Sequence, residues 1–448
     1  SPDPAAALLE RVRRTRAFVR DRFSPDRLNG CRPADVRRVL VIDSASRCGS
    51  SFLHYLLSRH LDVLSLNGEG SVFERLHGVG VARSADDSDF LPDDGTLPSA
   101  VPAAIAEDVL LDAGAPGPAA DGFRRDHYLA DCVQRLTLQY AESDFDAERA
   151  RAVCDRALGA AGAPGAPFEA AEYWRRALRG LRELPLPADP ARYDLRGSDP
   201  TADFPEAGNV LPPSFSEFAL EDPPFVVPRP RALPRPRELG SKTLLLKSSS
   251  DCYRMWLVRR LFPNAEFRFV VLTRNPAAAI SGLADGWLSD GFYSQNVGRF
   301  APLDISGYSR ADRPWTRTWW NFDLPPGWAG LRGGALEDVC AHQWASANEH
   351  ILRDSARGVV DDALRVRYES FLEAASLSRE LGRIFEFAGL DPARALDRGA
   401  APVMSVTPPA PQKWRKRRDA LAPRVAGARV AELARELGYD PSRWEEWA

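Results

Sequence analysis

The sequence predicts an α/β fold built on a parallel sheet with helices on both faces. Two segments carry this prediction. In Val39–Leu57 an apolar strand runs into a loop of small residues and then into an amphipathic helix. Over residues 243–288 a strand, a helix, a second strand and a second helix follow one another. Strands that alternate with helices are typical of parallel sheets, which bind ligands at the carboxyl ends of their strands.

The composition of the chain excludes several classes of protein. Its 448 residues suffice for a large core, and length alone permits two or three domains. The net charge is −3, so no strong field attracts nucleic acid, and no apolar run reaches membrane-spanning length. The six cysteines and six histidines show no zinc-type spacing, and no signal peptide is visible. We therefore expect a cytoplasmic protein with unpaired thiols, no nucleic-acid partner and no metal.

The first strand, expected over Val36–Ile42, leads into a loop that favours an anion. Gly49 permits close approach of the backbone to a phosphate, and Arg47 offers a forked cationic donor. Apolar side chains then recur at helical spacing from Phe52 to Leu61. The first turn of a helix has unpaired N–H groups and a positive dipole end, so the segment predicts a site for an anionic group.

This loop also resembles the phosphate-binding loop of kinases, G-x-x-x-x-G-K-[ST], but departs from it. Counted from Ser44, it keeps the central Gly49 and the final hydroxyl of Ser51, and it loses the first glycine and the lysine. That lysine serves the β- and γ-phosphates of a nucleoside triphosphate, which makes a P-loop nucleotide kinase the weaker alternative. Taken alone, this loop also fits a second interpretation, an ordinary strand–turn–helix with a serine cap.

The second segment directs three polar side chains towards one edge of the sheet. A strand over 243–247 ends at Lys247, and a strand over 267–273 ends just before Arg274. Helices are expected over 251–262 and 276–288, and Ser281 lies in the second of these. Because the carboxyl ends of parallel strands meet at the same edge, we expect these side chains beside the loop after the first strand.

Together these segments resemble the sulfotransferase family, which uses 3′-phosphoadenosine 5′-phosphosulfate. The matching motifs are Ser46-Arg47-Cys48-Gly49-Ser50-Ser51 for the 5′-phosphosulfate loop, Arg274-Asn275-Pro276 with Ser281 for the 3′-phosphate, Lys247 for the active-site lysine, Arg365-Val366-Arg367-Tyr368-Glu369 for the V-x-Y-E strand end, and Gln412-Lys413-Trp414 for the C-terminal lid. The resemblance is closest to the tyrosylprotein and bacterial sulfotransferases. It implies a P-loop sulfotransferase-type parallel sheet.

The resemblance also implies a role for each matching residue. The residues that would bind the cofactor are Arg47, Cys48, Gly49, Ser50, Ser51, Phe52, Arg274, Ser281, Tyr368, Lys413 and Trp414. In this branch a glutamate downstream of the loop arginine is the base, and Glu69 lies 22 residues after Arg47. Glu69 would remove the acceptor proton, while Lys247 and Arg47 would stabilise charge on the leaving phosphate oxygen. This chemistry needs no metal.

Three features of the chain depart from the family pattern. Ser281 lies seven residues after Arg274, one fewer than is usual. The arginine that often follows this serine is absent, and Asp285 and Trp287 occupy that stretch. Cys48 stands where a serine is usual. Which serine contacts the 3′-phosphate therefore stays open.

The identity of the base stays open as well. Without the family spacing, Glu69 would be an ordinary surface or capping carboxylate. His77 and His54 are the alternative bases, although a histidine one turn into a helix, as His54 is, is more often a buried structural residue.

We expect a single sulfotransferase domain over 1–448 with two insertions, at 80–240 and 291–335. The further expected elements are a helix over 8–23, a long, mobile loop over 84–122, helices around 123–140, 143–160 and 168–183, and an irregular proline-rich stretch over 185–240. The first insertion is expected to cap the acceptor site and not to fold independently. The tryptophan-rich second insertion either walls an acceptor pocket or pins a long loop.

The acceptor is the part of the function that the sequence leaves open. A phenol, an alcohol, a sugar and a peptide tyrosine all present a suitable hydroxyl. Only four of the 59 basic residues are lysines, a bias typical of a GC-rich genome, and we expect a small molecule of bacterial biosynthesis. A non-catalytic nucleotide-binding protein on the same fold is the second alternative, which the retained Glu69 and Lys247 argue against. The oligomeric state is not indicated.

Overall fold

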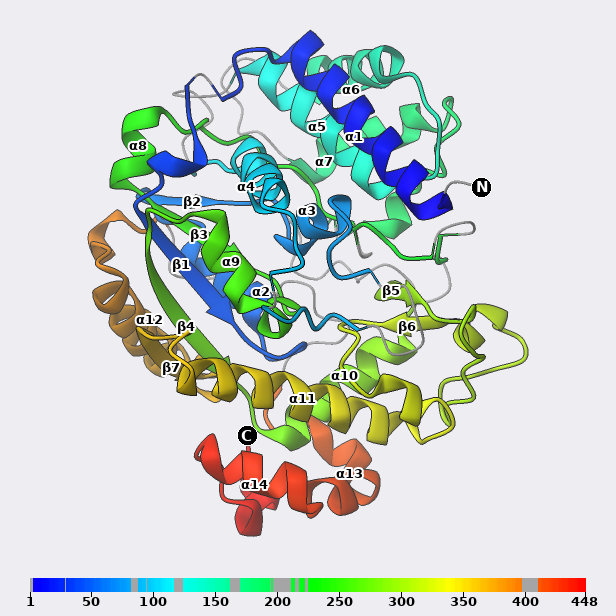
Figure 1. Cartoon of the computed structure of the whole chain (residues 1–448), viewed down its shortest axis with the longest axis vertical. Helices are drawn as coiled ribbons and strands as arrows, with labels where there is room; N and C mark the ends of the chain where they lie inside the picture. The colour runs from blue at the N-terminus through cyan, green and yellow to red at the C-terminus, as the bar shows by residue number, and fades with distance from the viewer. Residues whose placement is uncertain are drawn as a thin grey trace.

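A five-stranded parallel sheet forms the centre of the chain (Figure 1). The computed structural model describes residues 3–28, 30–81, 88–93, 95–116, 124–161, 170–193, 195, 211–213, 217–221, 225–396 and 410–448. The strands lie in the order β2 (Val63–Ser65), β3 (Thr243–Lys247), β1 (Arg38–Asp43), β4 (Glu266–Thr273) and β7 (Ala363–Arg367). All four neighbouring pairs are parallel, and Ile42 of β1 lies opposite both Lys247 and Val270. The predicted α/β fold is confirmed.

Alternate residues of the strands pack into two hydrophobic layers, one on each face of the sheet. Leu40 and Ile42 pack with α2 (Ser50–Leu57) and α12 (Ala374–Ala388). Val39 and Val41 pack into the larger layer on the other face. The helices of that layer include α3 (Ser71–Leu76), α9 (Met255–Leu261), α10 (Pro276–Leu288) and α11 (Leu336–Ala356). Helices therefore cover both faces, as the alternating pattern predicts.

Most core elements lie where the sequence places them. The expected strand over 243–247 and the expected helix over 276–288 coincide with β3 and α10. The helix expected over 251–262 is divided into a 3₁₀ turn, Asp251–Tyr253, and α9. The division falls at Arg254, whose backbone leaves the helical region and whose buried guanidinium binds Glu74 and Asp89.

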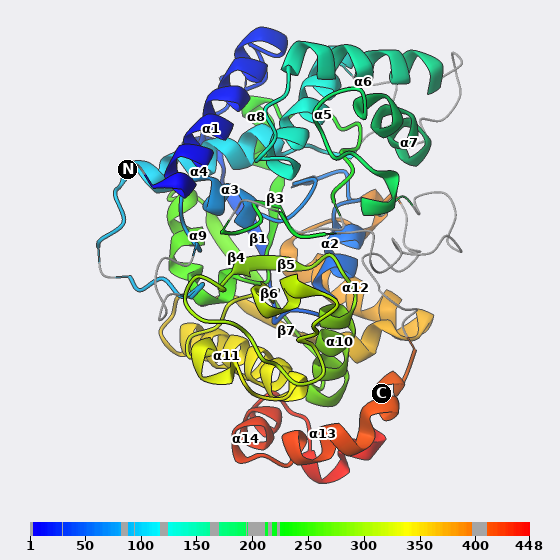
Figure 2. The same cartoon turned by 90° about the vertical axis from the view of Figure 1, so that its right-hand side faces the viewer.

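The first insertion contains several helices in the part that the structure describes. Its three predicted helices are α5 (Arg125–Gln139), α6 (Ala147–Ala161) and α7 (Ala170–Leu181). Together with α1 (Pro4–Phe23) they lie at one end of the molecule (Figures 1 and 2). Most apolar side chains of α5, α6 and α7, with Val19 of α1, form a hydrophobic cluster separate from the two layers on the sheet. Ala5, Leu9 and Val12 of α1 pack into the larger of those layers. That the insertion does not fold independently stays a prediction.

The long loop expected over 84–122 is wrong for part of its length. Residues Ala100–Asp112 form helix α4, with Ile105, Ala106 and Val109 buried. The alanines of this segment favour a helix, and Pro102 is tolerated in the first turn because the N–H groups there have no helical partner. Residues 84–87, 94 and 117–122 of the expected loop lie outside the described residues. Within the described part of 185–240, the one α-helix is the short α8 (Pro236–Ser241), as expected.

The second insertion and the C-terminus flank α10 and α11. The second insertion contains a two-stranded antiparallel ribbon, β5 (Tyr293–Asn296) and β6 (Trp319–Asn321). At the C-terminus, α13 (Arg418–Val425) and α14 (Ala428–Glu436) lie beside α10 and α11 (Figures 1 and 2). The 3₁₀ turn Lys413–Arg417 precedes α13 and contains the segment that resembles a C-terminal lid.

All six cysteines are buried and unpaired. A search of the described ranges for a helix with the length and apolarity needed to cross a bilayer found none. The six unpaired cysteines agree with the prediction of unpaired thiols.

The separate cluster of the helical insertion leads to a stability prediction. Leu178 on α7 is fully buried in that cluster, and Leu178→Ala should lower the free energy of unfolding by about 2–5 kcal/mol. The exposed Leu288→Ala is the control, with an expected effect within about 0.5 kcal/mol. Urea unfolding followed by tryptophan fluorescence measures both. A Leu178→Ala variant as stable as the Leu288→Ala control would show that the cluster contributes little.

Candidate active site

The loop between β1 and α2 leaves no room for a side chain at Gly49. Gly49 has a φ of +94°, and a Cβ added there would collide with the ring of Tyr368. Arg47 also has a positive φ, of 63°. The close packing of the Tyr368 ring on Gly49 joins the V-x-Y-E segment after β7 to the first turn of α2. Two motifs that are more than 300 residues apart in the sequence therefore form one surface.

Lys247 lies between the loop and the candidate base. It ends β3, and its side chain is 6% exposed. Its Nζ donates hydrogen bonds to Ser51 Oγ, at 3.1 Å, and to Glu69 Oε1. Ser248 Oγ donates to the other Glu69 oxygen at 3.3 Å. The structure thus brings the predicted lysine, the predicted glutamate and the loop hydroxyl into direct contact.

The environment of Glu69 favours its ionised form. Burial alone would raise the pKa of this carboxyl, but the nearby Lys247 and Arg75, with the hydrogen bond from Ser248, lower the pKa below its ordinary value of 4.5. The Glu69 side chain is 40% exposed, which leaves it accessible from the adjoining cavity. A carboxylate that is ionised at neutral pH and accessible has the state that a general base needs.

Arg47 and Arg274 lie side by side at the same edge of the sheet. Arg274 Nη1 donates to the backbone oxygen of Arg47 at 3.1 Å, and its guanidinium lies 4.6 Å from the centre of the Tyr368 ring. Burial, and then the charge of Arg274, lower the pKa of Arg47 to about 10. Within the described residues no carboxylate lies at ion-pair distance from Arg274. Two positively charged guanidinium groups side by side at one edge of the sheet favour the binding of an anionic ligand.

The second insertion packs against the loop between β1 and α2. Ser46 Oγ donates to Asp323 Oδ1 at 2.5 Å, and the Arg47 guanidinium lies 5.3 Å from the centre of the Phe292 ring. Phe292 stacks on Phe322, with ring centres 4.8 Å apart. Burial raises the pKa of Asp323 to about 7. These contacts attach the insertion directly to the arginine of the loop.

Ser281 and the C-terminal turn meet at α10. Ser281 Oγ accepts a hydrogen bond from Arg417 Nη1 at 3.2 Å. One turn further along the same helix, Asp285 binds Arg417 at 2.5 Å and Lys416 at 2.7 Å, and the ammonium of Lys413 lies 3.7 Å away. Asp285, which departs from the family pattern, therefore compensates three cations of the lid-like segment.

One cavity of about 1010 Å³ connects these groups. The predicted site residues on its wall are Arg47, Gly49, Ser50, Ser51, Phe52, Glu69, Lys247, Arg274, Ser281, Tyr368, Lys413 and Trp414. Cys48 is the exception among the predicted set: its side chain is buried beneath the loop, and burial raises the pKa of its thiol to about 12. Any part that Cys48 plays in binding falls to its backbone.

The two histidines named as alternative bases are unfavourably placed. His77 is not on the cavity wall, and its Nε2 lies 2.8 Å from Asp108 Oδ2. His54 does line the cavity, but burial, with the charge of Lys247, lowers its pKa to about 3. A histidine with so low a pKa is a weak base. The geometry therefore favours Glu69 over both.

The tryptophans of the second insertion do not line the cavity. Trp319, Trp320 and Trp328 are buried, and Trp320 packs against Trp287 and Trp328 with ring centres 5.1 and 5.8 Å apart. The insertion instead presents the two phenylalanines, Phe292 and Phe322, to the cavity. The buried tryptophans therefore hold the segment in place. The two phenylalanines form its part of the cavity wall.

A further part of the wall comes from the first insertion. Its lining residues are Pro116, Leu220, Glu221, Phe225, Val226, Val227, Arg229, Pro230 and Arg231. Sequence reasoning named none of these, and it also missed Arg75 of α3, which acts on the charge of Glu69. An arginine among the apolar residues of Ser71–Leu76 is a signal of a buried charge, and it lies six residues after Glu69. The wall residues over 220–231 carry no comparable signal.

No three His, Cys, Asp or Glu side chains gather into a metal-binding group within the described ranges. The polar groups on the cavity wall include cations, hydroxyls and the carboxylates of Glu69, Glu221, Asp285 and Asp323.

Comparison with known proteins gives structural neighbours alone. No family model and no curated protein matches the chain. Among solved structures, a sulfotransferase domain from the curacin biosynthetic pathway is 12% identical with a TM-score of 0.35, and 90% of this chain and 99% of that domain are covered. A sulfotransferase domain from the Synechococcus PCC 7002 olefin synthase is also 12% identical, with a TM-score of 0.37 and coverage of 90% and 96%. Both neighbours bear the name of the family that the motifs resemble, and at these scores the argument rests on the chain's own residues.

The contact between Lys247 and Glu69 leads to a prediction about ionisation. In Lys247→Met the pKa of Glu69 should rise above its ordinary 4.5, because burial remains while the nearest cation is lost. In the wild type the ion pair is complete above that value and is lost as the pH falls through the lower folded-state pKa. Carbon-13 NMR of glutamate carboxyls, assigned with Glu69→Gln, measures the shift.

Lys242→Met is the matched control for this titration. Lys242 lies at the other end of β3 and pairs with Glu238 at 3.4 Å, so its loss should leave the Glu69 signal unchanged. A Glu69 pKa that stays below 4.5 in Lys247→Met would mean that other groups hold the carboxylate ionised.

Proposed function

We propose that this protein is a sulfotransferase that moves a sulfuryl group from 3′-phosphoadenosine 5′-phosphosulfate to a hydroxyl of a small molecule, in bacterial biosynthesis. The observation that carries the proposal is the contact of Lys247 with both Ser51 and Glu69. It joins an anion-binding loop, a cation for the leaving group and a carboxylate base within one cavity. These are the three functions that in-line transfer to a hydroxyl requires.

The cations of the cavity suit a donor with two anionic ends. The 5′-phosphosulfate would lie against the loop and the first turn of α2, with Arg47 and Lys247 on either side. The 3′-phosphate would lie at Arg274 and Ser281, with Lys413 from the C-terminal turn. The rings of Phe52, Tyr368 and Trp414 lie on the wall between these groups and suit the adenosine.

The proposed transfer is balanced within the site. The acceptor oxygen forms a bond to sulfur as the bond from sulfur to the phosphate oxygen breaks. The acceptor proton passes to the Glu69 carboxylate, and the leaving phosphate oxygen takes the electron pair of the broken bond. Lys247 and Arg47 stabilise the negative charge that grows on that oxygen.

The shared hydrogen bond gives Lys247 a second role. While the lysine contacts Glu69, the carboxylate is held ionised but is also a poor proton acceptor. When Lys247 turns to the leaving phosphate oxygen, Glu69 loses this stabilisation and its basicity increases. The base would therefore gain strength at the moment when the acceptor proton must be removed.

The acceptor end of the cavity is mixed in character. The cavity wall that includes Glu69 also includes the apolar side chains of Val72, Leu220 and Phe225, with the charged Arg75 and Glu221. Such a wall suits a partly apolar molecule with a hydroxyl.

The proposed 3′-phosphate contact predicts a selective loss of affinity. Arg274→Ala should weaken binding of adenosine 3′,5′-bisphosphate by about 1.5–3 kcal/mol, because a charge-assisted contact is lost. It should leave adenosine 5′-phosphate nearly unaffected. Calorimetric titration measures both ligands. Equal weakening of the two would contradict the assignment.

Arg268→Ala provides the control for that titration. Arg268 lies on the same strand, β4, near its other end, and pairs with Glu266 at 2.7 Å, so neither ligand should be affected. The same titration with ATP and Mg²⁺ separates the kinase alternative. Tighter binding of ATP–Mg²⁺ than of the bisphosphate would favour a kinase over a sulfotransferase.

The proposed base predicts a loss of turnover without a loss of donor binding. Glu69→Gln keeps the size of the side chain and removes its basicity, and the transfer step should slow by about 10²–10⁴-fold. Single-turnover transfer from a ³⁵S-labelled donor measures the rate, and bisphosphate titration checks binding. His77→Ala is the control and should retain transfer. Loss in His77→Ala with retention in Glu69→Gln would move the base to His77.

A further inference from the structure

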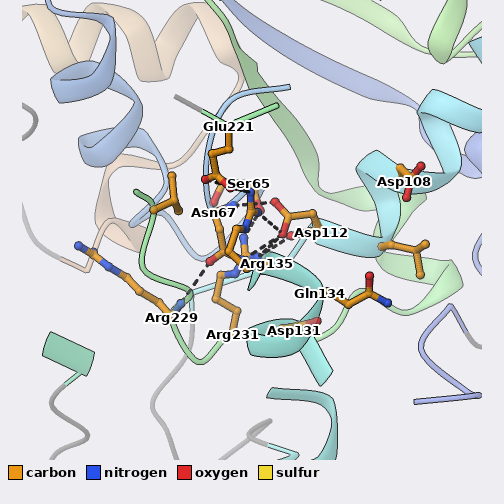
Figure 3. A network of polar contacts seen from close by, with 12 residues as sticks. Ser65, Asn67, Asp108, Asp112, Asp131, Gln134, Arg135, Glu221, Arg229 and Arg231 are labelled. Carbon is orange, nitrogen blue, oxygen red and sulfur yellow. Dashed lines mark hydrogen bonds and ion pairs between the residues drawn. The ribbon is translucent and has the colours of Figure 1, made fainter. Parts of the chain in front are cut away.

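A buried arginine of the helical insertion lies between two carboxylates near the candidate base (Figure 3). Arg135 on α5 has a side chain that is 2% exposed. Its Nη2 donates to Asp112 Oδ1 at 2.7 Å, and its Nη1 donates to Glu221 Oε2 at 3.2 Å. Asp112 ends α4, and Glu221 belongs to the segment that walls the cavity. One guanidinium thus joins three separate parts of the insertion.

Asp112 in turn holds the loop that carries Glu69. Its Oδ2 accepts a hydrogen bond from the backbone N–H of Asn67 at 3.0 Å, and its Oδ1 accepts one from Asn67 Nδ2 at 3.1 Å. Asn67 Oδ1 accepts a hydrogen bond from the backbone of Arg229 at 3.2 Å. Asn67 is therefore held through its side chain and its backbone, two residues before Glu69.

The residue between them packs directly on the ion pairs. A Cβ added at Gly68 would lie 3.6 Å from both Arg135 Nη1 and Glu221 Oε1. Arg231 adds hydrogen bonds to the backbone oxygens of Ser65 and Asp112, so the chain just before Asn67 is held as well (Figure 3). The path from Arg135 to Glu69 runs through the hydrogen bonds of Asp112 with Arg135 and Asn67 and then along the backbone through Gly68.

Stability alone is a poor explanation for this arrangement. Burying charged groups costs free energy that apolar side chains of the same size would not cost, so a buried ion network is weak evidence for a stabilising role. Its geometric consequence is specific, because a planar guanidinium fixes the directions of both carboxylates at once. Fixed carboxylates fix the loop, and the loop fixes where the Glu69 side chain begins.

We propose that Arg135 is a positioning residue for Glu69, acting through Asp112, Glu221 and the Asn67–Glu69 loop. The inference rests on the proposed function for the meaning of the Glu69 position. It gives the helical insertion a task in the transfer step besides walling the cavity. Arg135 itself touches neither the donor nor the acceptor.

The test is a double-mutant cycle with single-turnover transfer. Arg135→Met should slow the transfer step by about 10²-fold, the cost of a misplaced catalytic group, while bisphosphate affinity stays unchanged. In a Glu69→Gln background the same substitution should cost little more, because the group that it positions is already lost. Equal losses in both backgrounds would overturn the proposal and leave a general structural role. Arg135→Lys, which keeps the charge but not the fork, should recover part of the rate.

Arg16→Met is the matched control. Arg16 is also buried, pairs with Asp108 of α4 at 3.0 Å and donates to the backbone of Gln134 on α5 at 3.2 Å. It bridges the same two helices without reaching the loop, so it should lower stability and leave the transfer rate of folded protein intact. A rate loss as large as that of Arg135→Met would overturn the proposal.

Two further measurements distinguish a loss of positioning from a failure to fold. Asn67→Ala removes the side-chain link from the loop to Asp112 and leaves the buried ion pairs in place, so it tests the path even where Arg135→Met fails to fold; its transfer rate should also fall. The pKa of Glu69 by NMR should rise in Arg135→Met as the loop moves from Lys247. If the wild type transfers no sulfuryl group, the proposed function fails, and an unchanged Glu69 pKa separately overturns the positioning.

Discussion

The hydrogen bonds of Lys247 to Ser51 and Glu69 are the interaction on which the site depends. They require β3 to lie beside β1, so that the carboxyl end of one strand reaches the loop after the other. They also require the Asn67–Glu69 loop to follow β2, which is the other neighbour of β3. The strand order of the sheet is therefore what brings the cation, the loop hydroxyl and the carboxylate together.

The site contains more positive charge than its own carboxylates neutralise. The surrounding structure limits the free-energy cost of holding these cations close together. Arg47 and Arg274 lie over the rings of Phe292 and Tyr368, which attract cations without an ion pair. Glu69 compensates Lys247, and Asp285 compensates the C-terminal turn. Burial, and then the charge of Arg274, lower the pKa of Arg47. A cavity in this state attracts an anion, whichever nucleotide supplies it.

The sequence predicted the sheet and the loop-borne residues because local signals specify both. Apolar runs marked β3 and β4, and Lys247 and Arg274 stand at the ends of these runs. Helix α4 was missed because the surrounding stretch, 84–122, is rich in the Pro, Asp and Gly that are typical of loops. The contacts of Arg135 with Asp112 and Glu221 span 23 and 86 residues, and no periodicity within the insertion indicates such pairs. Tertiary packing determines these contacts of Arg135. It also determines which residues between 220 and 231 line the cavity.

The departures from the family pattern on α10 belong together physically. The helix presents Ser281 and, one turn later, Asp285 to the C-terminal turn, where both meet Arg417. Without Asp285, the ammonium of Lys413 would meet the like charges of Lys416, Arg274 and Arg47 without this opposing carboxylate, and like charges close together repel. A carboxylate on this helix therefore allows the turn to bring its cations to the site from a separate segment. The missing arginine and the added aspartate are two parts of one charge arrangement.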